Sequence, residues 1–112
     1  MRISTAYDAG KLVIRLAGEL DHHGAREAMR EIDGLIDEYL PRDTALDMEG
    51  LSFMDSSGIG LILGRLRQVS PIGGNVYLFG GSPSMRKMWE MSGILGKVTV
   101  LDTVEEMKEV YE

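Results

Sequence analysis

Two adjacent serines follow an aspartate and precede a glycine in the stretch Asp55-Ser56-Ser57-Gly58, at the start of an apolar segment. A serine hydroxyl can act as a nucleophile, accept a phosphate, or cap a helix through its oxygen. A hydrolase nucleophile elbow reads G-x-S-x-G, and neither Ser56 nor Ser57 has glycine two residues before it. We therefore expect no acyl-transfer catalysis and assign no catalytic residue.

His22 and His23 are the other residues whose type suggests chemistry, here metal binding. Helical metal ligands usually lie four residues apart, whereas adjacent residues point about 100° apart around a helix. The chain has no cysteine, no spaced third ligand and neither of the common phosphate-binding glycine patterns. The sequence thus predicts no metal site and no NTP hydrolysis, and leaves the histidines on a first helical turn, where an interaction role stays open.

Two interpretations of Ser56 and Ser57 remain. A cap residue that accepts a hydrogen bond from a first-turn amide contributes about 1 kcal/mol. A hydroxyl at a helix N-terminus is also where a phosphate is well tolerated, because free amides and the positive end of the helix dipole face it. Phosphorylation adds about −1.5 to −2 charge, which would change a docking surface without unfolding the protein. The residues alone leave a simple cap and a phosphorylated switch both open.

The segments around these residues alternate between strand and helix patterns. Apolar strand patterns occupy residues 2–8, 11–17, 45–48, 76–79 and 98–101. Candidate helix caps follow four of these strands, namely Asp21, Asp55 or Ser56, Ser82 with Pro83, and Asp102 or Thr103. This β-β-α-β-α-β-α-β-α order predicts an α/β fold in which a small mixed sheet of four to five strands is packed by about four helices.

Apolar residues at helical spacing mark the faces that the helices should bury. The first face includes Tyr39 and Leu40, and the last helix has Val104, Met107, Val110 and Tyr111. The stripe predicted for the second helix is Ile59, Ile62, Leu63, Leu66 and Val69. Gly60 and Gly64 lie on one side of that helix and each costs nearly 1 kcal/mol relative to alanine, so a close backbone contact is expected there.

The sequence also makes predictions about one connection and about the methionines. Residues 51–54 are expected to form a tight connector after the third strand. Most of the eight methionines should fill the core, and Met54, Met88 and Met91 are secondary candidates for a contact surface.

The composition restricts the classes of partner. The 112 residues include 12 basic and 18 acidic side chains, with a formal charge of −6 and no clustered basic face, so no nucleic-acid binding is expected. The N-terminus lacks a signal-peptide pattern and no apolar run approaches the roughly 18 residues of a membrane span. We expect a single domain over residues 1–112, in the cytoplasm, with no membrane partner.

Three stretches resemble those of the anti-sigma factor antagonists of the STAS domain family. They are GELDHHGA at 18–25, LSFMDSSGIGLILGR at 51–65 and SPSMRKMWEMSGI at 82–94, in the family's order and over nearly the whole chain. The D-S-[ST]-G-[LI]-G core is common to such antagonists, whereas GELDHH and FMDSSG…LGR are more typical of the sporulation members. The resemblance implies a STAS fold, a small sheet covered by helices on one side.

The resemblance also implies a binding protein that is not an enzyme. Such proteins bind a cytoplasmic anti-sigma factor that is also a serine kinase, and thereby free a sporulation sigma factor. The kinase uses ATP to phosphorylate the antagonist, which switches it off, and a PP2C-type phosphatase restores it. The chain itself is expected to need no cofactor, although weak nucleotide binding has been ascribed to the family. The alternative is a nucleotide- or small-ligand-binding STAS module.

Carried onto this sequence, the family's motif makes Ser57 the phosphate acceptor and Asp55 and Ser56 its neighbours. Asp21 matches a loop acid that the family places beside the acceptor, where it orients the serine or contacts the partner.

Other positions match the family less directly. The expected partner-binding surface also includes His22, and Gly58, which should leave the backbone open to the kinase. Arg65 and Arg67 match basic helix positions and are expected to be solvated. Gly24 stands where the family often has a larger residue and is expected to loosen the start of the first helix.

Overall fold

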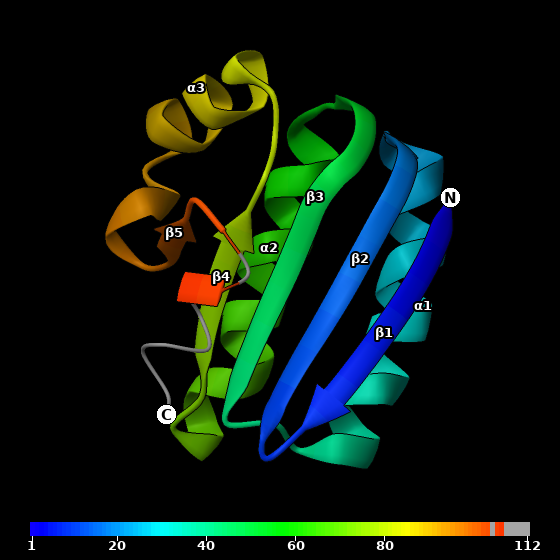
Figure 1. Ribbon diagram of the computed structural model, residues 1–112. Coiled ribbons are helices and arrows are strands. Elements are labelled where there is room, and N and C mark those ends of the chain that lie inside the picture. The colour runs from blue at the N-terminus through cyan, green and yellow to red at the C-terminus, as the bar shows by residue number, and fades with distance from the viewer. Residues whose placement is uncertain (104, 107–112) are drawn as a thin grey trace.

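The computed structural model describes residues 1–103, 105 and 106. A β-hairpin is followed by three strands that alternate with helices (Figure 1). In chain order the elements are β1 (Arg2–Asp8), β2 (Lys11–Leu20), α1 (His22–Tyr39), β3 (Asp43–Met54), α2 (Ser56–Val69), η1 (Ser70–Ile72), β4 (Asn75–Phe79), α3 (Pro83–Ser92), η2 (Ile94–Gly96) and β5 (Thr99–Leu101).

The five strands form one mixed sheet in the order β1-β2-β3-β4-β5. β1 pairs antiparallel with β2, and every later neighbour is parallel. Figure 1 shows α1 and α2 side by side behind the sheet, with α3 at the upper end of β4. Because β2, β3 and β4 run the same way, their carboxyl ends share one edge, and α1, α2 and α3 all begin there.

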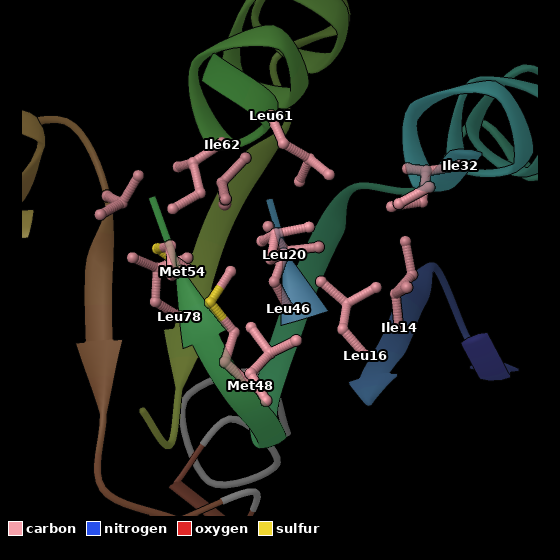
Figure 2. Packing of buried hydrophobic residues seen from close by; sticks show 14 of the residues in the cluster. Ile14, Leu16, Leu20, Ile32, Leu46, Met48, Met54, Leu61, Ile62 and Leu78 are labelled. Atoms are coloured by element: carbon pink, nitrogen blue, oxygen red, sulfur yellow. The ribbon is translucent and has the colours of Figure 1, made fainter. Parts of the chain in front are cut away.

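The main core lies between the sheet and the helices. Figure 2 shows Leu61 and Ile62 of α2 and Ile32 of α1 pointing toward strand residues such as Leu46 and Leu78. All five side chains are fully buried. A smaller cluster comes from alternate strand positions, which point away from this core: Val13, Ala45, Tyr77 and Leu101. The predicted mixed α/β sheet is therefore confirmed.

The predicted connector at residues 51–54 is wrong, because β3 continues through it to Met54. These residues stay paired with β2, from Gly18 opposite Leu51 to Leu20 opposite Met54, with one register shift between Gly18 and Glu19. The polar pair Glu49-Gly50 interrupts the apolar pattern. Pairing with a distant strand keeps the segment extended despite that interruption.

The end of α1 also differs from the apolar pattern. Tyr39 and Leu40 are exposed rather than buried, at 38% and 64%. Leu40 caps the helix in the left-handed conformation at φ 46°, ahead of Pro41. Tyr39 stacks on Tyr7 of β1, with 4.4 Å between the ring centroids.

The buried face of α2 is rotated from the predicted stripe. Leu61 is fully buried, while Ile59, Leu63 and Leu66 are only partly buried. The expected close contact at Gly60 and Gly64 is wrong, since an added Cβ at either position would meet no heavy atom within 4 Å.

Three α-helices lie within the described part of the chain. The sequence also predicted a final helix with Val104, Met107, Val110 and Tyr111. These four residues lie outside the residues that the structure describes. The candidate cap of that helix, Thr103, does accept a hydrogen bond from the amide of Glu106, at 3.3 Å to Oγ1.

Candidate functional site

The edge of the sheet where β2 and β3 end gathers the polar residues that the sequence singled out. β2 ends at Leu20 and leads to Asp21, while β3 ends at Met54 and leads to Asp55. The amide of Asp55 donates to the carbonyl of Leu20 at 3.3 Å. This bond joins the two loops, so the N-termini of α1 and α2 lie next to each other.

Asp55 caps α2. Its Oδ1 accepts a hydrogen bond from the amide of Ser57 at 2.8 Å, and its carbonyl accepts one from the amide of Gly58 at 3.0 Å. Ser56 is the first helical residue and is exposed, and Ser57 is half-buried. Within the described residues, neither serine hydroxyl makes a hydrogen bond. The capping requirement is therefore met by the carboxylate, which leaves both hydroxyls at the helix N-terminus without a structural task.

Asp21 has the equivalent position on α1. Its Oδ1 accepts from the amide of Gly24 at 2.8 Å, and its carbonyl accepts from the amide of Ala25 at 2.8 Å. The predicted cap is thus confirmed. With Asp55 it places two carboxylates, both partly buried, at the edge that holds Ser57.

The two histidines are the first residues of α1, directly after the cap Asp21. Both are exposed, and Nε2 of His23 lies 3.1 Å from Oε1 of Glu27, one helical turn on. Among the described residues, no three His, Asp or Glu side chains gather where they could hold a metal ion.

At two positions of this edge, close packing leaves no room for a side chain, so that glycine is required. Gly58 is buried, and a Cβ there would lie 2.5 Å from Cγ of Met54 and 3.1 Å from Cδ2 of Leu20. The expectation that Gly58 leaves the backbone open to a partner is therefore wrong. Gly24 is also buried, and a Cβ there would collide with the carbonyl of Glu19. It permits the tight entry into α1 rather than loosening it.

The two arginines of α2 have different environments. Arg67 is exposed, as expected. Arg65 is buried, and its Nη1 lies 2.7 Å from Oδ1 of Asp33 on α1. Burial lowers the pKa of Arg65, and the charge of Asp33 and its hydrogen bond oppose that shift. The expectation that Arg65 is solvated is wrong, and the residue links α2 to α1.

A groove of about 560 Å³ opens between α2 and α3 beside this edge. Its lining residues are Ser56, Ile59, Ser84, Lys87, Met88, Met91 and Ser92. Met91 is 79% exposed, whereas Met54 is buried and therefore takes no part in this surface. The sequence raised Met88 and Met91 as contact residues but could not show that they share a groove with Ser56, because the position of α3 relative to α2 is a tertiary feature.

Comparison with known proteins identifies the family of this chain. The model of the STAS domain matches residues 2–107. The anti-sigma F factor antagonist of Lysinibacillus sphaericus is 45% identical over 83 residues, which cover 74% of this chain and 71% of that protein.

Solved structures of the anti-sigma factor antagonist SpoIIAA give the same result. Its unphosphorylated form matches with a TM-score of 0.75 and 34% identity, covering 97% of this chain and 96% of that one. The phosphorylated form of SpoIIAA, described as a Bacillus cell fate determinant, has the same TM-score and identity and covers 97% and 99%. Within the residues described here, no helix has the length and apolar character of a membrane-crossing segment.

Proposed function

We propose that this chain, which belongs to the STAS domain family, is an anti-sigma factor antagonist whose activity is switched by phosphorylation of Ser57. It acts as a binding module and a kinase substrate rather than as an enzyme. Its partners are a cytoplasmic anti-sigma factor with serine kinase activity, which releases a sporulation sigma factor on binding, and a PP2C-type phosphatase.

The observation that carries the proposal is the unused pair of hydroxyls at the start of α2. Asp55 supplies the cap, so a serine is not needed there for stability. A partly exposed hydroxyl at a helix N-terminus is accessible to a second protein, and its phosphate would face the positive end of the helix. The existence of a phosphorylated form of SpoIIAA supports the same reading.

The chemistry at Ser57 is a phosphoryl transfer that the partner carries out. The Oγ of Ser57 attacks the γ-phosphorus of ATP, its bond to the β-phosphate oxygen breaks, and ADP leaves. Within the described residues Ser57 Oγ has no hydrogen bond to a base of its own chain, so the kinase supplies the group that takes the hydroxyl proton. ATP is therefore the kinase's substrate, and this chain needs no cofactor.

Release follows from charge. The docking edge already carries the carboxylates of Asp21 and Asp55, and the phosphate adds about −1.5 to −2. A 100-fold loss of affinity needs only about 2.7 kcal/mol, which one misplaced charge can supply in a desolvated interface. The fold is retained because the phosphate lies outside the core. His22 and Ser56 belong to the same proposed contact surface.

The test compares Ser57→Ala with the matched variant Ser56→Ala. Both should keep the native circular dichroism spectrum and bind the anti-sigma factor. After incubation with that kinase and ATP, mass spectrometry should detect one phosphate on the wild type and on Ser56→Ala, and none on Ser57→Ala. A phosphate that persists in Ser57→Ala and disappears in Ser56→Ala would assign the acceptor to the other serine and overturn the proposal. Ser57→Asp should stay folded and bind weakly.

A further inference from the structure

We propose that the groove between α2 and α3 is a second part of the docking surface, which receives an apolar side chain of the anti-sigma factor accompanied by a carboxylate. This inference rests on the proposed function, because it names the surface that the same partner uses beyond Ser57.

The groove is lined mainly by apolar side chains and small serines. Ile59 of α2 and Met88 and Met91 of α3 line it, together with three serines. Met91 is 79% exposed, more than any other large apolar side chain among the described residues. Methionine side chains are flexible and polarizable, which suits a surface that adapts to a partner. A lone exposed apolar residue needs no explanation, but here three apolar side chains share one depression.

The groove is continuous with the phosphorylation site. Ser56 lines it, and Ser56 directly precedes Ser57 at the start of α2. A standard protein interface buries about 800 Å² on each partner, which corresponds to a disc of roughly 16 Å radius. A kinase that reaches the hydroxyl of Ser57 with an interface of that size must extend over its surroundings. Because the groove begins one residue away, it falls within that footprint.

The charge of the groove indicates which group of the partner would bind beside it. Lys87 is the one charged side chain among the seven residues that line the groove, and it is exposed. The carboxylates of Asp21 and Asp55 lie at the caps of the neighbouring sheet edge. The docking surface therefore has a basic apolar side and an acidic side. A carboxylate of the partner beside Lys87 would complement the first and fix the orientation of the complex.

The groove is separate from the reacting atoms, which predicts a distinct kinetic effect. Loss of contacts that are the same before and during phosphoryl transfer weakens binding without slowing the chemical step. Variants in the groove should therefore raise the KM of the kinase for this chain and leave kcat unchanged.

The experiment measures binding of purified variants to the anti-sigma factor by isothermal titration calorimetry. The groove variants are Met91→Asp, Met91→Ala and Lys87→Glu. One control is Ile72→Asp, half-exposed in η1, beyond the far end of α2, a helix about 21 Å long. The other is Lys97→Glu, exposed after η2. Circular dichroism checks that each variant is folded. Because Met91 is so exposed, its variants should fold normally.

We expect Met91→Asp and Lys87→Glu to weaken binding at least tenfold, Met91→Ala to weaken it about threefold, and both controls to stay within twofold of wild type. KM should rise with affinity loss while kcat holds. If wild type binds but the groove variants match it, or if the controls weaken binding equally, the groove has no docking role. If wild type itself fails to bind, the proposed function is wrong instead.

Discussion

Replacing Gly60 or Gly64 with alanine should stabilise the protein, whereas the same change at Gly58 should not. All three glycines lie in α2. An added Cβ at Gly60 or Gly64 meets no heavy atom within 4 Å, so alanine gains helix propensity without a clash. The expected gain is about 1 kcal/mol for each change. For a domain of this size that corresponds to a rise in Tm of about 4 °C.

Gly58 has the opposite environment. Its added Cβ would lie 2.5 Å from Cγ and 2.9 Å from Sδ of Met54, in a fully packed region. Overpacking of this kind costs about 1 to 3 kcal/mol, which cancels or exceeds the propensity gain. The net effect of Gly58→Ala should lie between no change and a loss of about 2 kcal/mol.

Urea unfolding followed by circular dichroism separates these cases, provided that the m-value stays constant. Gly60→Ala and Gly64→Ala should move the midpoint up, and the double variant should add the two gains. Binding of the anti-sigma factor should not change in either variant. A lower midpoint for Gly60→Ala or Gly64→Ala, or a clear gain for Gly58→Ala, would refute the packing argument.

Three further changes test single contacts, each by urea unfolding. Asp33→Asn leaves the buried guanidinium of Arg65 without its partner and should cost about 1 to 3 kcal/mol; a second change, Arg65→Met, should recover much of the loss. Asp55→Ala should cost about 1 kcal/mol through the lost cap, and Ser56→Ala should cost nothing; equal costs would contradict the assignment of the cap to Asp55. Burial raises the pKa of Tyr77 above its ordinary value of 10.0, so the folded state keeps a proton that the unfolded chain loses, and stability should fall as the pH rises above about 10. Tyr77→Phe should remove that part of the alkaline loss, and an unchanged pH profile would exclude Tyr77 as its source.

Local features could be predicted from the sequence because their physical causes span only a few residues. Ser82 with Pro83 starts α3, as their types require. Asp21 likewise caps α1. Each depends on hydrogen bonds or backbone conformation within about one turn of the chain.

In the candidate site, too, some features could be predicted from the sequence and others could not. The serine pair, its aspartate and the helix that follows were evident from residue type and spacing. Which residue caps was not, because the sequence offered both Asp55 and Ser56, and only the hydrogen bond to the amide of Ser57 decides it. That distinction matters for function, since it frees both hydroxyls.

The amino-acid sequence by itself determined the order of strands and helices, the caps of α1 and α3 and the place of the serine pair, because short-range propensities and hydrogen bonds act along the chain. Only the tertiary structure decided that β3 reaches Met54, that Gly58 is packed while Gly60 and Gly64 are free, and that α3 forms a groove beside Ser56. It also decided that Arg65 is buried against Asp33. These features depend on which surface of another element each residue meets, and that surface is supplied by residues distant in the chain.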